Sequence, residues 1–199
     1  MLRGDPPVTT YFTSDTHFGH AGMLSDRMGR PRPFGSREEH DEHLVSAWNN
    51  RVRPGDRVFH VGDFAYGCSM KHAEAIFSRL AGHKTLLRGN HEARGERLGW
   101  EGGIHDVVAI SIQDSGMANA VPVWLSHYAH VTWRDIHRGR LHFYGHSHGA
   151  IPPTARACDV GVDCWQFRPV TVPEIQELLA DVAARQAGDA LAGSMAQAA

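Results

Sequence analysis

The chain has 199 residues, of which 42% are hydrophobic and 21% are charged, and its formal net charge is −2. This length fits one domain, or one domain with a short tail, and the composition is that of an ordinary globular protein. The chain has no run of about 18 apolar residues, no apolar leader near its start and only three cysteines, so we expect a cytoplasmic protein without membrane contacts or a disulfide framework.

The predicted elements in the first half alternate between strand and helix. They are a strand over residues 9–14, a helix that a Ser36–Glu39 capping box opens and that runs to about Asn50, a strand over 57–61, a helix over 69–80 and a strand over 84–87. Strands that alternate with helices favour parallel pairing.

The second half has a different pattern. Residues 107–112 and 121–125 flank a polar, glycine-containing loop, which predicts an antiparallel hairpin. Strands over 141–144 and 160–164 follow, and then a helix that begins at a Thr171–Glu174 cap. Together these patterns predict a mixed sheet, or two packed sheets, covered by helices. Residues 1–182 would form this domain, and 183–199 would be a fraying helix end and a disordered tail of small and polar residues.

Histidine is unusually abundant, with 15 residues, and it is the commonest metal ligand in proteins. Five predicted strands end in residue types that bind metals. The clusters are Asp15-Thr16-His17, Gly62-Asp63, Gly89-Asn90-His91, Ser126-His127 and Gly145-His146-Ser147-His148. Ligands of α/β sheets bind beyond the carboxyl ends of the strands, so we expect these clusters to converge on one pocket.

The donor types indicate the chemistry of this pocket. Carboxylate, imidazole and amide groups without a thiolate suit Mn, Fe or Zn. Seven donors are too many for one metal with an open position but fit two metals, and one aspartate could bridge them. Two-metal sites of this kind stabilise the attacking and leaving oxygens of phosphoryl transfer.

The motifs DTH, GD, GNHE, SH and GHSH, in this order, resemble the calcineurin-like metallophosphoesterase superfamily. The segments FTSDTHFGH and VFHVGDF are similar to those of its small bacterial and phage branch, and DVGVDCW extends the resemblance to Trp165. The resemblance implies a four-layer α/β/β/α sandwich of two mixed sheets, with a dinuclear centre at its rim.

The same resemblance implies a role for each matching residue. The first metal would be held by Asp15, His17 and His148, Asp63 would bridge, and the second metal would be held by Asn90, His127 and His146. His91 would protonate the leaving group, and a metal-bridging hydroxide would attack. We expect two divalent metal ions per chain, Mn²⁺ first, with Fe, Zn, Ni or Co as alternatives.

Two departures from the family pattern matter. After Asp63 the chain lacks the second aspartate and the arginine of Ser/Thr protein phosphatases, which argues against a protein phosphatase and leaves the partner of His91 open. Glu92 stands where many relatives carry aspartate.

Other residues have two readings. His130 could compete with His127 as a ligand, although His127 directly follows the predicted strand. His20 could contact substrate phosphate or cap a turn, and Arg88 could contact phosphate or form an exposed ion pair.

We therefore expect a metal-dependent phosphoesterase for phosphomonoesters or phosphodiesters, with a small phosphodiester or nucleotide slightly favoured. The alternatives are a nuclease of the same superfamily and an inactive metal-binding module. Nucleic acid is the less favoured partner because the net charge is near zero, although Arg27, Arg30, Arg32 and Arg37 form a loose basic stretch. The sequence does not indicate an oligomeric state.

Overall fold

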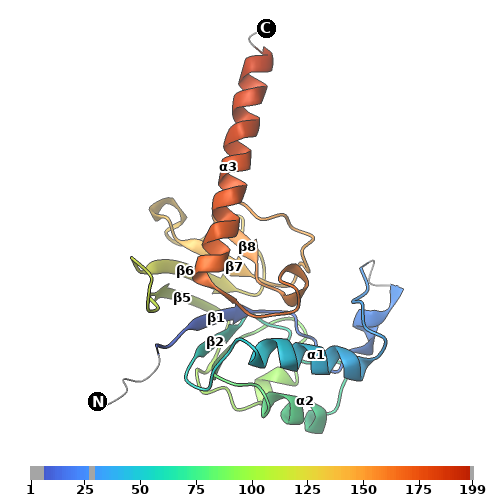
Figure 1. The fold of residues 1–199 in the computed structure, drawn as a ribbon. Helices are drawn as coiled ribbons and strands as arrows, with labels where there is room; N and C mark the ends of the chain where they lie inside the picture. The colour runs from blue at the N-terminus through green and yellow to red at the C-terminus, as the bar shows by residue number, and fades with distance from the viewer. Residues whose placement is uncertain (1–6, 27–29, 198–199) are drawn as a thin grey trace, which may run out of the picture.

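The structure is a computed structural model that describes residues 7–26 and 30–197. Its strands form two sheets, one of five strands and one of four. Figure 1 shows the sheets stacked between helices, with α1 (Arg37–Asn49) and α2 (Met70–Phe77) on one side and α3 (Val172–Gln197) on the other. The predicted α/β architecture of two mixed sheets flanked by helices is confirmed.

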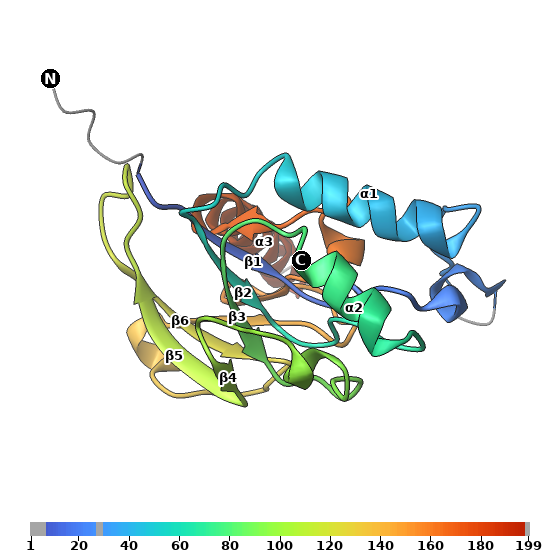
Figure 2. The same cartoon turned by 90° about the horizontal axis from the view of Figure 1, so that it is seen from below.

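The first sheet carries the strands of the N-terminal half. Its order is β4-β3-β2-β1-β9, with four parallel strands and β9 antiparallel to β1. The strands are β1 (Thr10–Thr13), β2 (Arg57–His60), β3 (His83–Leu87), β4 (Ile104–His105) and β9 (Val170–Thr171). The parallel pairing predicted from the alternation of strands and helices is therefore present, and Figure 2 shows α1 and α2 along the same outer side of this sheet.

The second sheet has the order β5-β6-β7-β8. Its strands are β5 (Val107–Ile112), β6 (Val121–Ser126), β7 (Leu141–Tyr144) and β8 (Ala157–Asp159). β5 and β6 form the predicted antiparallel hairpin, in which Val107 pairs with Ser126 and Ile112 with Val121. β6, β7 and β8 are parallel, so the carboxyl ends of β6 and β7 lie at the same edge.

The central strands are buried on both faces. Tyr11 belongs to the core cluster under α1 and α2, whereas the next residue, Phe12, belongs to the cluster between the sheets. Val58 and Phe59 of β2 follow the same alternation because successive side chains of a strand point to opposite faces. Each large apolar side chain buried in this way contributes roughly 1.5–3 kcal/mol. Packing on both faces therefore fixes where each strand ends, and with it where each motif loop begins.

Helix ends follow the predicted caps. The Ser36 hydroxyl accepts a hydrogen bond from the Glu39 N–H at 3.1 Å, at the start of α1. The Thr171 N–H donates to the Glu174 carboxylate at 2.9 Å, at the start of α3. These side chains satisfy N–H groups that a first helical turn leaves unpaired.

The predicted strand over 160–164 is wrong. β8 ends at Asp159, and Val162–Cys164 is a short 3-10 turn, η5. The Val162 N–H donates to the Ser14 carbonyl at 3.1 Å, so this segment leaves β8 and bonds to the end of β1 in the other sheet. This crossing brings Asp163 to the carboxyl end of β1.

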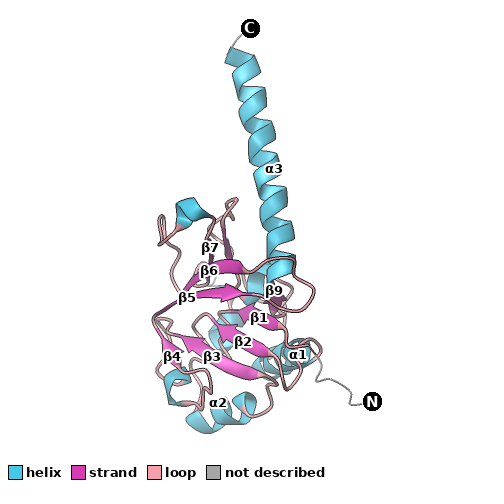
Figure 3. Ribbon diagram, turned by 90° about the vertical axis from the view of Figure 1, so that its left-hand side faces the viewer, coloured by secondary structure: helices cyan, strands magenta, loops and turns pink. Residues whose placement is uncertain are grey.

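The C-terminal helix is longer than expected. α3 runs to Gln197, so residues 183–197 are helical where the sequence predicts a fraying helix end and a disordered tail, and residues 183–189 are exposed. Figures 1 and 3 show this half projecting from the sheets. Alanine, frequent in this segment, has the highest helix propensity, which explains the difference. The division at residue 182 stays a prediction. Within residues 7–26 and 30–197, no helix combines the length and apolar character needed to cross a membrane.

Candidate metal centre

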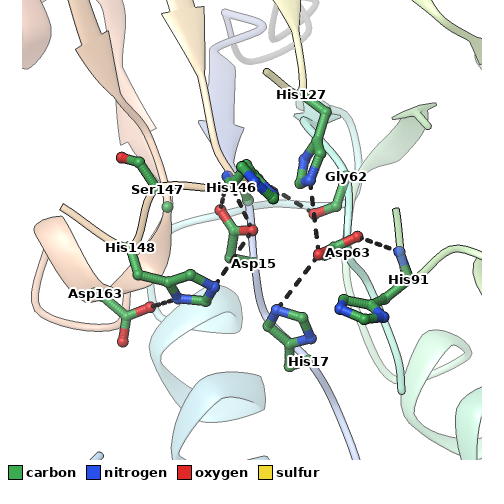
Figure 4. A network of polar contacts seen from close by, with 12 residues as sticks. Asp15, His17, Gly62, Asp63, His91, His127, His146, Ser147, His148 and Asp163 are labelled. Atoms are coloured by element: carbon green, nitrogen blue, oxygen red, sulfur yellow. Dashed lines mark hydrogen bonds and ion pairs between the residues drawn. The ribbon is translucent and has the colours of Figure 1, made fainter. Parts of the chain in front are cut away.

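The predicted clusters converge at one edge of the two sheets. The clusters of Asp15, Asp63 and Asn90 follow the carboxyl ends of β1, β2 and β3, which are parallel neighbours. Those of His127 and His146 follow β6 and β7, which are parallel in the other sheet. Figure 4 shows residues from both sheets pointing toward a common space. Five loops that are distant in sequence thus form one polar site.

Three of the predicted ligands form a first group. Asp15, His17 and His148 each offer a ligand atom, and these atoms lie within 4.8 Å of one another. Asp15 and His17 are 0% and 3% exposed, so both lie beneath the surface. Burial lowers the pKa of His17 well below its usual value, which keeps a lone pair on the ring. The group therefore combines the buried carboxyl group of Asp15 with the neutral imidazole of His17.

Asp63 lies between two histidines. Its Oδ2 is 3.6 Å from Nε2 of His17 and 3.6 Å from Nε2 of His127. Its other oxygen, Oδ1, accepts a hydrogen bond from the His91 N–H at 2.8 Å. Asp63, His127 and Asp15 form a second group of ligand atoms within 4.8 Å. Asp63 is therefore a carboxylate that faces one imidazole of each group.

Asn90 connects the two sheets at the open side of the site. Its Oδ1 lies 3.0 Å from Nε2 of His127 and 2.8 Å from Nδ1 of His146. The other ring nitrogen of His127, Nδ1, is 2.8 Å from the Val61 carbonyl, which can only accept a hydrogen bond. Nδ1 therefore carries the proton, and Nε2 is left to bind a metal. Asn90 and His146 are exposed, unlike His127.

Most of these ligands have an unusual backbone conformation. Five of the seven predicted ligands have positive φ angles between 46° and 65°: Asp15, His17, Asp63, His146 and His148. A residue with a side chain pays about 1–3 kcal/mol for such a conformation, and it persists only where the surroundings enforce it. Backbone strain concentrated at one edge is typical of a functional site.

Hydrogen bonds between motif loops hold this backbone in place. The N–H of Asp15 donates to the Gly62 carbonyl at 2.9 Å, and that of His17 donates to the Asp63 carbonyl at 3.0 Å. The loops approach so closely that a Cβ on Gly89 would lie 2.1 Å from Oδ1 of Asp63. The glycine of the GNHE motif is therefore required by packing against the Asp63 carboxylate.

Glu92 joins the second and third motifs. Its buried carboxylate accepts hydrogen bonds from the N–H groups of Asp63 at 2.6 Å, Gly89 at 3.1 Å and Phe64 at 3.2 Å. Burial raises the pKa of Glu92 to about 7, despite these three bonds. The longer side chain at this position thus has a structural role, in which it fixes the loop that carries Asp63.

The sequence did not predict the side chain that orients His148, which is Asp163. Nδ1 of His148 lies 2.7 Å from Oδ2 of Asp163, which leaves Nε2 directed toward Asp15. Arg32 is 3% exposed, donates to Asp163 at 2.7 and 2.8 Å, and also donates to the Asp15 and Thr16 carbonyls. Burial alone would raise the pKa of Asp163, but the hydrogen bonds from His148 and Arg32 hold it well below its usual range. The sequence signal for such support is a carboxylate that can pair with a predicted histidine ligand. Asp163 was not considered for this role because it falls within the strand predicted over residues 160–164.

Aromatic rings surround His91. Its ring centroid is 4.3 Å from that of Tyr66 and 5.7 Å from that of His17. Among the described residues, no carboxylate is recorded as a hydrogen-bond partner of the His91 ring. On the other side, the exposed Tyr128 lies 4.7 Å from the ring of His146. Two exposed tyrosines thus flank the site.

The structure distinguishes between the alternatives for His127 and His130, and it shows where His20 lies. His130 hydrogen-bonds Trp124 and packs on His142, away from Asp63, whereas His127 faces Asp63. The His20 ring lies 5.6 Å from that of His17 and 4.7 Å from that of Tyr66, beside the site.

Arginines of the predicted basic stretch and Arg88 are mostly paired. Arg88 forms ion pairs with Glu96 at 3.0 Å and Asp106 at 2.9 Å. These contacts agree with the second alternative for Arg88, an exposed ion pair. In the basic stretch, Arg32 is buried and Arg37 pairs with Glu38. Arg30 lines a cleft, and Arg27 lies outside the described residues.

The residues present fit divalent metal ions. Both ring nitrogens of His17 are buried and have no hydrogen-bond partner, although buried polar groups are normally paired. Burial also raises the pKa of Asp15 well above its usual value, so its charged form needs a nearby cation. Orphaned imidazole nitrogens facing buried carboxylates are what a metal would satisfy.

The fold and the arrangement of these side chains agree with a match to a known protein family. The family model for calcineurin-like phosphoesterases matches residues 8–130, and the chain belongs to that family. The matched segment includes the motif residues from Asp15 to His127, whereas His146 and His148 lie beyond it.

Proteins of similar length resemble the chain over most of its residues. The chain is 30% identical over 173 residues to uncharacterised protein MJ1445 of Methanocaldococcus jannaschii, covering 85% of this chain and 90% of that protein. It is 28% identical over 203 residues to the gene 66 protein of Mycobacterium phage D29, covering 86% and 96%. The crystal structure of AQ665, a protein of unknown function from Aquifex aeolicus, has the same fold, with a TM-score of 0.62, 23% identity and coverage of 86% and 99%.

Proposed function

We propose that this chain is a dinuclear metal-dependent phosphoesterase that hydrolyses small phosphodiesters or nucleotides. The observation that carries the proposal is the position of Asp63, whose Oδ2 faces His17 and His127 at 3.6 Å each. One carboxylate between two sets of imidazole ligands suits two metals a few ångströms apart. When bound, such metals activate water and stabilise charge on phosphoryl oxygens.

The predicted ligands form two sets, one for each metal ion. Asp15, His17 and His148 would hold the first metal, and Asp63 would bridge. The second metal would be held by the residues around the Asn90 amide oxygen, namely Asn90, His127 and His146. Oxygen and imidazole donors without thiolate suit Mn, Fe or Zn, and we place Mn²⁺ first among them.

His91 would supply the proton to the leaving group. Its backbone is fixed by the hydrogen bond from its N–H to Asp63, so the ring is held beside the proposed bridging carboxylate. The rings of Tyr66 and His17 restrict its orientation. A positioned acid of this kind contributes roughly 10² to 10⁴-fold to the rate.

A nuclease is less supported by these contacts. Nucleic-acid binding depends on several free cationic side chains along one surface. Of the described arginines in the predicted basic stretch, Arg32 and Arg37 are engaged with carboxylates. We therefore favour a small substrate.

The test is hydrolysis of bis(p-nitrophenyl) phosphate and p-nitrophenyl phosphate by the metal-free chain and after addition of Mn²⁺. We expect activity only with metal, and a metal content of two per chain by elemental analysis. One metal at saturation would contradict the dinuclear proposal. Binding of two metals without hydrolysis of either ester, or of nucleotide esters, would favour the inactive module.

A further inference from the structure

A cleft of about 680 Å³ opens beside the metal centre. His148 and Asp163 form part of its lining, so the cleft reaches the group of residues around Asp15. Met23 and Phe167 contribute apolar surface, and the remaining lining residues are Arg30, Pro31, Arg32, Pro33, Ser147 and Ala150. Its volume is large enough for an organic group the size of a nucleoside.

Phe167 is held in a strained conformation at this cleft. Its φ is 61°, and the preceding residue, Gln166, has a φ of 55°. Its ring meets Phe34 edge to face, with centroids 5.0 Å apart. Strain of this kind is concentrated at ligand-binding segments, where it positions a side chain in advance. A half-buried aromatic ring at a cleft can stack on a flat apolar group.

The cleft also carries a positive charge. Arg30 is exposed and, within the described part of the chain, forms no ion pair with another residue. The neighbouring Arg32 differs, since its guanidinium is buried against Asp163. The combination of a flat apolar wall and a free guanidinium matches an anionic ligand with an aromatic ring.

The position of the cleft distinguishes the two ester groups of a phosphodiester. The His17 ring lies between those of His148 and His91, at centroid distances of 5.3 and 5.7 Å. Figure 4 shows Asp163 and His148 on one side of the centre and His91 on the opposite side. If His91 protonates the leaving group, the cleft lies on the side of the group that remains on phosphorus.

We infer that this cleft binds the retained substituent of a nucleotide phosphodiester, with the base against Phe167 and the anionic phosphate end attracted by Arg30. The inference rests on the proposed function and makes the chain a diesterase in preference to a monoesterase. In the reaction the oxygen of water bonds to phosphorus and the bond to the leaving oxygen breaks. The leaving group takes a proton, and the retained ester bond to the nucleoside is unchanged, so the products are an alcohol and a nucleotide.

The kinetic test uses esters with one leaving group and different retained groups. We compare the p-nitrophenyl ester of thymidine 5′-phosphate with methyl p-nitrophenyl phosphate. If the base stacks on Phe167, kcat/KM should be roughly tenfold or more higher for the thymidine ester than for the methyl ester. Phe167→Ala should reduce this preference at least about fivefold. Phe167→Leu keeps an apolar side chain in the core contact and should therefore fold normally. Because leucine has no flat face, this variant should also reduce the preference for the thymidine ester.

A binding test is independent of turnover. Saturation-transfer NMR on the metal-free chain with thymidine 5′-phosphate should show transfer to the base protons, which Phe167→Leu diminishes. Arg30→Gln should weaken this binding several-fold at low salt, because it removes the free charge. Arg185→Gln, an exposed arginine on the projecting part of α3, is the matched control and should have no effect.

The outcomes separate the two proposals. Equal kcat/KM for both esters, or a thymidine preference that the Phe167 variants leave unchanged, would overturn the cleft assignment while the phosphoesterase proposal stands. Hydrolysis of neither ester with any of the expected metals would overturn the proposed function. In that case the NMR experiment still tests whether the cleft binds the base, because it does not require turnover. No saturation transfer to the base protons would overturn the cleft assignment.

Discussion

The two sides of the proposed metal centre are built in different ways. The buried side comprises Asp15, His17, Asp63 and His127, which are at most 3% exposed. Backbone hydrogen bonds between loops hold its first three residues, as between His17 and Asp63. The open side comprises Asn90, His146 and His148, which are exposed or half-buried and are held by side-chain contacts such as that of Asp163 with His148. We therefore expect changes on the buried side to affect both metals, and changes on the open side to affect one.

The largest effect is expected for Asp63→Asn. The substitution keeps the shape and the contact with the His91 N–H but removes the charge between the proposed metal sites. Activity should fall by more than the 10- to 100-fold typical of an outer contact, and both metals should be lost. Elemental analysis and hydrolysis of bis(p-nitrophenyl) phosphate measure these effects. Asp106→Asn is the control, because Asp106 is an exposed partner of Arg88.

Asn90→Ala changes a predicted ligand on the open side. It removes a neutral ligand that the charge of Asp63 cannot replace, so one metal per chain should remain. If both metals dissociate together in this variant, or two full equivalents remain in Asp63→Asn, the division of the centre into two sides is wrong.

His91→Ala should retain both metals and lose rate in a way that depends on the leaving group. A poor leaving group needs a proton from a positioned acid, so the loss should be roughly 10² to 10⁴-fold for alkyl esters. A nitrophenolate leaves as an anion, so its esters should show a much smaller loss. Both ester types are measured on wild type and variant. An equal loss would mean that His91 orients the phosphate instead.

Gly89→Ala tests the packing of the buried side. The new Cβ would lie 2.1 Å from Oδ1 of Asp63, so the loops must separate. We expect a loss of about 1–3 kcal/mol in the free energy of unfolding, together with weaker metal binding. Gly55→Ala is the matched control, since a Cβ there meets nothing within 4 Å. Similar melting temperatures for the two variants would contradict the packing argument.

The smallest effect is expected for Asp163→Asn. The variant weakens the hydrogen bond that orients His148, and ligand partners of this kind typically change metal affinity 10- to 100-fold. We expect a value near the lower end, because His148 is on the open side. Metal titration should show one weakened site, and Glu42→Gln, in the exposed pair with Arg79, should show none. Equal weakening of both sites would mean that Asp163 acts on the fold as a whole.

Local sequence patterns are enough to predict most of the elements and the order of the motifs. Short runs with adjacent apolar residues located β2 and β3, and the Ser36–Glu39 and Thr171–Glu174 caps located the starts of α1 and α3. These signals are local, because they depend on residues within a few positions of one another. The expected convergence of the motif clusters also followed from strand order, since carboxyl ends of parallel strands share an edge.

The residues that support the site are brought together by contacts between distant parts of the chain. Arg32 looked like part of a basic surface, but it is buried against Asp163, which is 131 positions away. Residues 160–164 have the composition of a strand, yet hydrogen bonding to Ser14 in the other sheet turns them toward the centre. Pairing of this kind depends on which loops the two sheets bring together, and no local pattern encodes it. The positive φ angles of the five ligands have the same origin, because contacts between loops enforce a conformation that each residue by itself disfavours.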